Sequence, residues 1–167
     1  MPAPSKVQLP ADIVIRRPTA ADGPAIEAMF ARCSLESRYR RFHAPVVKIP
    51  AVHLERILDP GSADEAWLGV TRDDPDTVIA LGSWTRSGTD GELAILVEDA
   101  WQRRGIGSAF VALLADAAWN AGVCRVTAWV FRESRHVLRM LRAVLGPVAT
   151  AHDGPVSHVT MDRRPAG

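Results

Sequence analysis

Two glycines in the middle of the chain carry its strongest chemical signal. An apolar stretch of strand length, residues 93–97, leads through a short polar turn to Gly105-Ile106-Gly107, and helix-favouring residues follow. The first N–H groups of a helix have no partner inside the helix, and the helix dipole adds roughly half a positive charge there. A glycine has no Cβ, so a ligand can lie close to the main chain. The segment therefore predicts a site for an anion, above all a phosphate or pyrophosphate.

Two common phosphate-binding motifs do not fit this turn. A P-loop needs a Gly followed five residues later by Gly-Lys and then Ser or Thr, and no such Lys follows here. A Rossmann fingerprint needs a small residue three positions after its second Gly, where this chain has Phe110. That fingerprint also normally lies near the start of a domain, whereas this turn comes after more than half of the chain.

A third pattern fits. Residues 102–107, Gln-Arg-Arg-Gly-Ile-Gly, resemble the Gln/Arg-x-x-Gly-x-Gly/Ala acyl-CoA signature of the GCN5-related N-acetyltransferases (GNATs). A bare Gly-x-Gly would be weak evidence for this family. The motif is more specific when the preceding strand, Val97 and Trp101 are included. Residues 34–42 and 97–102 also resemble the protein-lysine-acetyltransferase branch of that superfamily, although most members of the branch have Gly at position 103, where this chain has Arg.

The order of the predicted elements agrees with the same resemblance. We expect strands at residues 13–16, 66–71, 77–84, 92–97, 124–131, 148–152 and 156–161, and helices at 20–33, 34–42 or 37–42, 52–58, 107–121 and 134–145. Thr19 is expected to cap the first helix. The fold implied is α/β (α+β), a mixed and mostly antiparallel central sheet flanked by helices. Residues 1–11 are expected to be a flexible arm, and residues 12–163 a single domain.

The resemblance also implies how the cosubstrate acetyl-CoA is bound. The strands at residues 92–97 and 124–130 would splay apart, and pantetheine would lie between them against the main chain of Leu96 and Val97. Gln102 belongs to the signature, and the side chains of two arginines can add charge-assisted contacts to phosphate. The pyrophosphate would be held by backbone N–H groups of Arg103, Arg104, Gly105, Ile106, Gly107, Ser108 and Ala109. No metal is expected, because the five histidines lack ligand spacing.

Glu92 is the candidate general base. Acetyl transfer needs a deprotonated amine, and a carboxylate near the thioester can accept the proton. Strand alternation places Glu92, Ala94 and Leu96 on one face. The alternative is a solvated glutamate beside a turn. The general acid is missing: the one tyrosine, Tyr39, lies far upstream of the last helix, where many family members carry a Tyr, and Ser134 or His136 are the substitutes.

The function implied is an acetyl-CoA-dependent N-acetyltransferase that works by direct transfer in a ternary complex, with a primary amine such as a protein lysine as acceptor. One alternative is an acetyltransferase for small-molecule amines such as an aminoglycoside, a polyamine or an amino acid. The other is a non-catalytic acyl-CoA-binding sensor, which the missing Tyr keeps open. Dimers are common in the fold, so a homodimer is a further option that no segment demonstrates.

Composition sets the remaining expectations. A net charge of +1 over 167 residues gives no global field for nucleic acid or membranes, and no apolar stretch approaches the roughly 20 residues of a membrane span. The N-terminus lacks the apolar core of a signal peptide, so a cytoplasmic protein is expected. Cys33 and Cys124 are predicted to be reduced and buried. The tryptophans expected in the core are Trp67, Trp84, Trp119 and Trp129.

Overall fold

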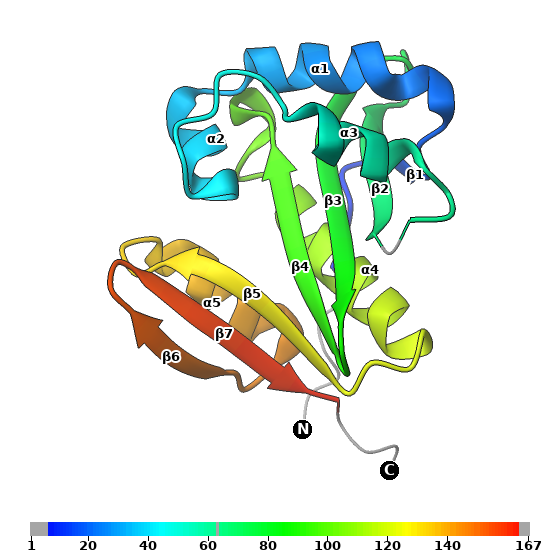
Figure 1. Cartoon of the computed structure of the whole chain (residues 1–167). Coiled ribbons are helices and arrows are strands. Elements are labelled where there is room, and N and C mark those ends of the chain that lie inside the picture. The colour runs from blue at the N-terminus through cyan, green and yellow to red at the C-terminus, as the bar shows by residue number, and fades with distance from the viewer. Residues whose placement is uncertain (1–6, 63, 164–167) are drawn as a thin grey trace.

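The computed structural model describes residues 7–62 and 64–163, which contain a seven-stranded sheet with the strand order β1-β2-β3-β4-β5-β7-β6 (Figure 1). The strands are β1 (Ile13–Arg16), β2 (Asp64–Thr71), β3 (Val78–Ser87), β4 (Asp90–Val97), β5 (Arg125–Phe131), β6 (Ala149–Asp153) and β7 (Val156–Asp162). The α-helices are α1 (Gly23–Arg32), α2 (Leu35–Phe42), α3 (Ala51–Leu58), α4 (Ile106–Asn120) and α5 (Arg135–Leu145). Two 3-10 turns, η1 (Ala20–Asp22) and η2 (Asp99–Trp101), complete this part of the chain.

The pairing of β4 with β5 is the feature that shapes the molecule. These two strands are parallel, whereas the other described strand pairs are antiparallel. They pair only at Asp90–Arg125, Gly91–Val126 and Glu92–Thr127. From Leu93 onward the strands diverge, which gives the V seen in Figure 1. The predicted splay of the two central strands is confirmed, and so is the predicted fold.

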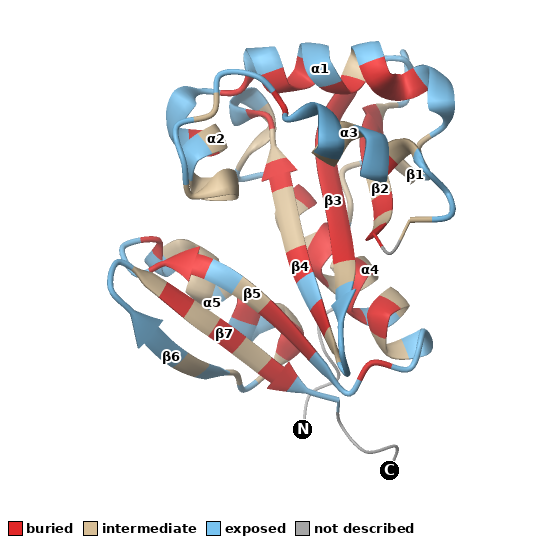
Figure 2. Cartoon of the chain, viewed as in Figure 1, coloured by how far each residue is buried: buried red, intermediate tan, exposed pale blue. Residues whose placement is uncertain are grey.

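Two apolar clusters hold the helices on opposite faces of the sheet. One joins α4 and α5 to the sheet and includes Phe110, Leu114 and Leu93, and the other joins α1 and α3 to it and includes Ile26 and Leu96 (Figure 2). Leu93 and Leu96 thus lie in different clusters, which confirms the expected alternation along β4. Burial of such side chains contributes roughly 1.5–3 kcal/mol each.

Close packing of α4 on the sheet fixes the position of its first turn. A Cβ on Gly82 of β3 would overlap with the ring of Phe110, so only glycine lets this ring lie directly against the strand. Phe110 is fully buried, and Ile106, one helical turn earlier, is 1% exposed. These two apolar anchors hold the start of α4 at the wide end of the V.

Several predicted boundaries were wrong by a few residues. Thr19 forms a capping box with Asp22 of η1, and α1 begins only at Gly23, because Pro24 suits the first helical turn. For α2 the first of the two predicted starts is correct: Ser34 caps the helix, since its hydroxyl oxygen accepts the Ser37 N–H at 3.1 Å. The turn between β3 and β4 shrinks to Gly88-Thr89, with Gly88 at φ +61°.

Two predictions of burial were also wrong. Cys33 is buried as expected, but Cys124 is exposed. Trp84 is 2% exposed, as expected, but Trp129 is 40% exposed. The side chain of Trp129 lies on the face of β5 opposite the apolar cluster that joins α4 and α5 to the sheet. Residues 1–6 of the expected arm lie outside the described residues. Leu9 packs against the core, so this end of the predicted arm contacts the domain.

Candidate active site

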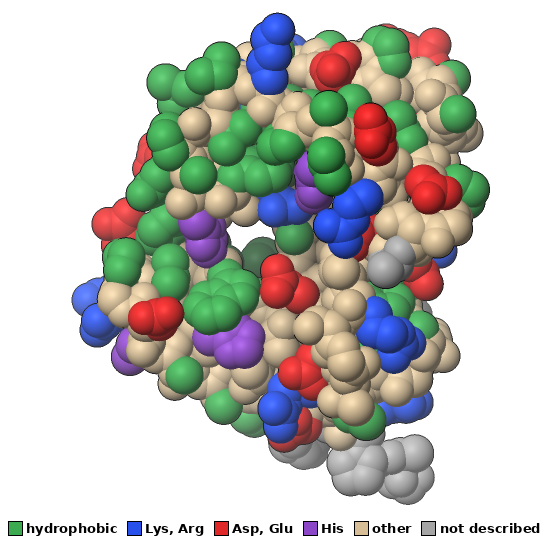
Figure 3. Space-filling model, in the orientation of Figure 1, with side chains coloured by type: hydrophobic (Ala, Val, Ile, Leu, Met, Phe, Trp, Pro, Cys, Tyr) green, Lys and Arg blue, Asp and Glu red, His purple; other side chains and the backbone are tan. Residues whose placement is uncertain are grey.

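Three elements enclose an opening in the middle of the molecule. β4 and β5 form two sides, which meet where Glu92 pairs with Thr127. Helix α2 forms the third side, because it contacts the chain just after β4 and also stacks Tyr39 on Phe131 at the end of β5, with ring centroids 5.3 Å apart. Figure 3 shows the opening between the parts of the molecule that carry α2 and β5. We call this closed arrangement of β4, α2 and β5 the ring.

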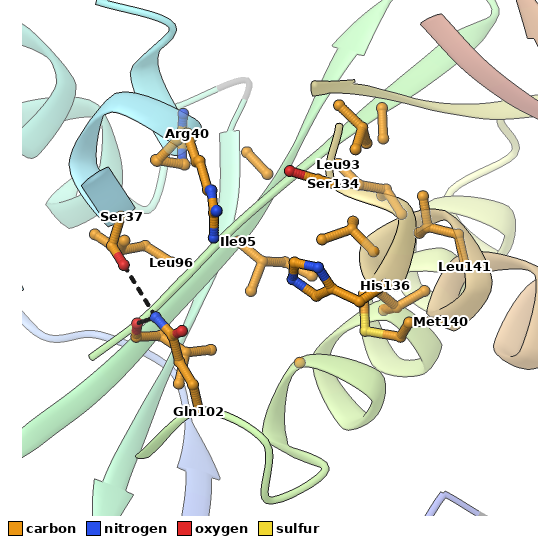
Figure 4. Close-up of a pocket in the computed structure, with 18 of the residues that line it drawn as sticks. Ser37, Arg40, Leu93, Ile95, Leu96, Gln102, Ser134, His136, Met140 and Leu141 are labelled. Carbon is orange, nitrogen blue, oxygen red and sulfur yellow. Dashed lines mark hydrogen bonds between the residues drawn. The ribbon is translucent and has the colours of Figure 1, made fainter. Parts of the chain in front are cut away.

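The ring surrounds a cavity of about 600 Å³. Figure 4 shows Ser37 and Arg40 of α2 facing His136 and Met140 of α5 across it. The sequence-predicted site residues that line the cavity are Glu92, Leu96, Val97, Gln102, Arg103, Gly105, Gly107 and Ser108. Residues of β4, of the turn before α4 and of α4 itself therefore lie around the same cavity.

Three other predicted residues do not line the cavity. Arg104 forms an ion pair with Asp12 (3.0 Å) and lies over the ring of Trp101. Ile106 is buried in the core. The N–H of Ala109 donates to the carbonyl oxygen of Gly105 at 3.1 Å, so it is the first amide of α4 to enter the helical pattern.

The turn before α4 has an unusual backbone. Gly105 caps the helix at φ +82°, and Arg103 adopts φ +62°, a left-handed conformation that costs a non-glycine residue about 1–2 kcal/mol. Most members of the resembled branch have glycine at this position, and the backbone geometry supplies the reason. Gly105, Gly107 and Ser108, at the start of α4, line the cavity, and the start of a helix favours an anion.

A hydrogen-bond network ties this turn to α2. Gln102 Nε2 donates to Ser37 Oγ and to the carbonyl oxygen of Val97, both at 3.0 Å. The carboxylate of Asp99 accepts from the Ser34 N–H, from Ser34 Oγ and from Ser37 Oγ. Burial alone would raise the pKa of Asp99, but these hydrogen bonds outweigh it and hold the pKa below its usual value. The two stretches that resembled one branch in the sequence are thus in direct contact.

Glu92 lies where the ring begins to open. Its side chain is exposed, on the face of β4 opposite Leu93, and it lines the cavity. Asp64, the other carboxylate near this wall, forms two short contacts with Arg56 (2.9 and 3.0 Å) and accepts a hydrogen bond from Thr85. Among the ion pairs of the described residues, none involves Glu92.

The candidates for a general acid differ in their surroundings. Ser134 and His136, at the start of α5, both line the cavity. Burial, followed by the positive charges of Arg103 and Arg40, lowers the pKa of His136, which favours its neutral form. Tyr39 is far upstream in the sequence but lies beside Phe131, only three residues before Ser134. Sequence distance was thus a poor guide to its position.

The wall of the cavity near Glu92 also includes residues outside the sequence-predicted site. Arg41, His43 and Trp129 all line it. The indole of Trp129 lies over the imidazole of His158, with ring centroids 4.4 Å apart. The sequence of residues 38–42 did not show which of its arginines line the cavity. Arg40 and Arg41 both do, because α2 contacts both strands.

Residues 7–62 and 64–163 contain no group of three or more His, Cys, Asp or Glu side chains arranged to hold a metal ion. Of the helices within these ranges, none has the length and apolar character needed to cross a membrane.

Comparison with known proteins agrees with this geometry. The acetyltransferase (GNAT) family model matches residues 31–146, so the chain belongs to the GNAT family of acetyltransferases. No curated protein sequence matched. The fold is similar to the GNAT domain of Streptomyces lividans PAT, with a TM-score of 0.78, 22% identity and 89% of each chain covered.

Two solved structures with bound ligands are also similar in fold. PaiA N-acetyltransferase from Thermoplasma acidophilum, solved with coenzyme A, has a TM-score of 0.67 at 12% identity, with 90% of this chain and 99% of that chain covered. Spermidine N-acetyltransferase from Vibrio cholerae, solved with CoA and spermine, has a TM-score of 0.69 at 11% identity, with 92% and 96% covered.

Proposed function

We propose that this acetyltransferase moves the acetyl group of acetyl-CoA directly to a primary amine bound in the same complex, with Glu92 as the general base. One observation carries the proposal. β4 and β5 separate immediately after Glu92, so an exposed carboxylate lies where the edge of β4 stops pairing and begins to line the cavity. A thioester held along that edge would place its carbonyl near this carboxylate.

Several features of the cavity wall support the binding of acetyl-CoA. Beyond Leu93 the edge of β4 no longer pairs with β5, so the main chain of Leu96 and Val97 can pair with pantetheine as an added strand would. The pyrophosphate would lie at the amides of residues 103–108, ending before Ala109, whose N–H already has an acceptor. The side chain of Arg103 lines the same space and can add a charge-assisted contact.

The reaction follows from these positions. The ammonium of the acceptor loses a proton to Glu92, directly or through water, and the lone pair of the neutral amine attacks the thioester carbonyl. The tetrahedral intermediate collapses, the C–S bond breaks to release the thiolate, and the second proton on the nitrogen passes to the thiolate or to water, which leaves the neutral amide. The hydroxyl of Ser134, which lines the cavity, can donate a hydrogen bond to the departing sulfur. A thiolate can also leave without a dedicated acid, since its pKa near 8.5 makes it a tolerable leaving group.

Two acceptor classes have support. The segment of residues 34–42 and the similarity to the GNAT domain of PAT support a protein lysine. The similarity to a spermidine acetyltransferase supports a small amine. In both cases the amine would enter beside Glu92, on the face of β4 that points away from α4.

The test is a thiol-release assay over a panel of amines and lysine peptides, run on the wild type and on Glu92→Gln. We expect amine-dependent release of CoA, and a fall of about a hundredfold or more in kcat for Glu92→Gln with acetyl-CoA binding retained. Equal rates for the two proteins across pH would show that Glu92 is not the base. Tight binding of acetyl-CoA with no transfer to any amine would instead identify an acyl-CoA-binding sensor.

A further inference from the structure

The wall of the cavity beside Glu92 contains a cation without a carboxylate partner. Arg41, at the end of α2, lines the cavity, and none of the ion pairs among the described residues includes it. Its neighbour Arg40 differs, because it pairs with Glu36 at 2.6 Å. Placing a guanidinium inside a protein without a counter-charge is costly, so the position of Arg41 needs an explanation.

The surroundings of Arg41 leave most of its donors unused. Its Nη2 donates to Nε2 of His53 at 3.1 Å, and this is its one hydrogen bond to the described residues. Because a guanidinium cannot accept a hydrogen bond, His53 must be neutral and carry its proton on Nδ1. Burial, and then the charge of Arg41, lower the pKa of His53 to about 4, consistent with that form.

Arg41 itself stays charged at neutral pH. Protein atoms surround its guanidinium closely, and this burial lowers its pKa to about 10, against the favourable charges of Glu92 and Asp64. Burial and the charge of Arg41 also lower the pKa of His43, which favours neutral His43. Asp64 is already engaged by Arg56 and Thr85. Arg41 and Glu92 therefore both line the cavity, and neither forms an ion pair with another of the described residues.

Arg41 and Glu92 have different charged neighbours from those of His136. The positive charges that act on His136, at the start of α5, come from Arg103, Arg40 and Arg139. The charge of Arg41 instead acts on His43 and His53, and the negative charge of Glu92 stabilises the charged form of Arg41. The phosphates of the cofactor are expected near Gly105 and Gly107, so Arg41 is left for the acceptor.

We propose that Arg41 binds a carboxylate of the acceptor, so that the substrate carries an amine and a carboxylate close together. The inference rests on the proposed function. The ammonium of the acceptor meets Glu92, and its carboxylate meets the fork of donors on Arg41, an arrangement that guanidinium groups favour. A purely cationic acceptor such as a polyamine would instead be repelled by Arg41. The carboxylate can come from a free amino acid or from an acidic residue beside a peptide lysine.

Matched substrates isolate the carboxylate. Lysine and cadaverine, or ornithine and putrescine, differ only by that group. Two blocked peptides with a single lysine, flanked by Asp in one and by Asn in the other, test the peptide source. We expect the wild type to prefer the carboxylate-bearing member of a pair by about tenfold to a hundredfold in kcat/KM. Whichever pair shows the preference identifies the source.

Variants test whether Arg41 is responsible. In Arg41→Gln the ratio of kcat/KM within a pair should fall toward one, and in Arg41→Lys it should be intermediate, because the charge remains but the fork is lost. Lys48→Gln removes one positive charge from the exposed loop after α2 and should keep the wild-type ratio. Should Arg41→Gln fail to fold, the wild type and Arg41→Lys decide the question.

A wild type without preference in any pair would overturn the inference, and so would an Arg41→Gln variant that slows both members equally. Should no amine be acetylated, the proposed function fails, and binding then tests the inference separately. In the presence of CoA, lysine should raise the melting temperature of the wild type more than cadaverine does, and Arg41→Gln should abolish that difference. Equal shifts for the two compounds would contradict the inference.

Discussion

Gln102 and Ser37 are joined by a hydrogen bond of 3.0 Å between Nε2 and Oγ, which links the acyl-CoA signature to helix α2 across 65 residues of sequence. The same Gln102 amide also donates to the carbonyl oxygen of Val97. The residue of the signature that precedes the two glycines therefore fixes the position of the turn against β4 and against the third side of the ring.

The first prediction concerns this link. Gln102→Ala and Ser37→Ala should each lower the free energy of unfolding by about 1 kcal/mol. The double variant should be less destabilised than the sum of the two, with an interaction energy of about 0.5 kcal/mol or more, because either change alone breaks the shared hydrogen bond. Urea denaturation of the four proteins measures this. Strict additivity would show that the bond contributes nothing to stability.

The second prediction separates the roles of the two glycines. Gly105→Ala should lower the free energy of unfolding by about 1–2 kcal/mol, since φ +82° is strained for alanine. Gly107 has no such conformation, and a Cβ there would lie 3.4 Å from Met140 Sδ, an ordinary contact. Gly107→Ala should therefore keep or raise stability, by up to about 1 kcal/mol.

The same two variants should also differ in CoA binding. The acyl-CoA signature allows alanine at the position of Gly107, so Gly107→Ala should keep a Kd for CoA close to that of the wild type. Gly105→Ala strains the turn beside the cavity and should raise this Kd. Calorimetric titration with CoA, beside denaturation curves, measures both quantities. Unchanged affinity in Gly105→Ala would contradict binding of the pyrophosphate at this turn.

A third prediction follows from the left-handed backbone of Arg103. Arg103→Gly should raise the free energy of unfolding by up to about 1 kcal/mol, because glycine relieves the strain at φ +62° but has more freedom to lose on folding. The same change should weaken CoA binding if the arginine contacts a phosphate. Arg103→Lys keeps both the charge and the strain, and serves as the control. A less stable Arg103→Gly protein would contradict the strain argument.

The fourth prediction concerns pH. The pKa of His53 is about 4 in the folded protein, below its ordinary value of 6.5, so the unfolded chain binds more protons between these two pH values. Stability should therefore fall as pH drops from 6.5 to 4. Asp22, with a pKa of about 2 caused first by its hydrogen bond to Arg16, loses its contribution only at lower pH.

His53→Gln tests this assignment. The glutamine oxygen can still accept from Arg41, but the side chain does not titrate. The loss of unfolding free energy between pH 7 and pH 4.5, measured in urea, should be smaller in the variant than in the wild type. His43 and His136 remain, and their lowered pKa values preserve part of the slope. Equal slopes in the two proteins would show that His53 is not the group that titrates.

Local patterns predicted most of the fold. The apolar stretch before Gly105, the glycines and the helix after them depend on neighbouring residues, so one sequence was enough to predict the strand, the turn and the start of α4. Their agreement with a family signature then supplied the class of fold and the divergence of β4 from β5.

Contacts across the ring could not be predicted in the same way. That Arg41 faces the cavity depends on how α2 is anchored at both ends, by Asp99 after β4 and by Phe131 at the end of β5. Trp129 was expected in the core because strands favour aromatic residues, but the sequence did not reveal which face of β5 lacks a helix. The position of Arg41 and the exposure of Trp129 both depend on tertiary arrangement rather than on local preference.

Because β4, α2 and β5 form a closed ring, the space inside the ring opens on two sides. α4 and α5 lie at one of them, whereas Glu92 and Trp129 belong to the strand faces that point toward the other. A cosubstrate bound on the side of α4 and α5 and an acceptor bound on the side of Glu92 would then not have to pass each other, and neither product would need to leave first.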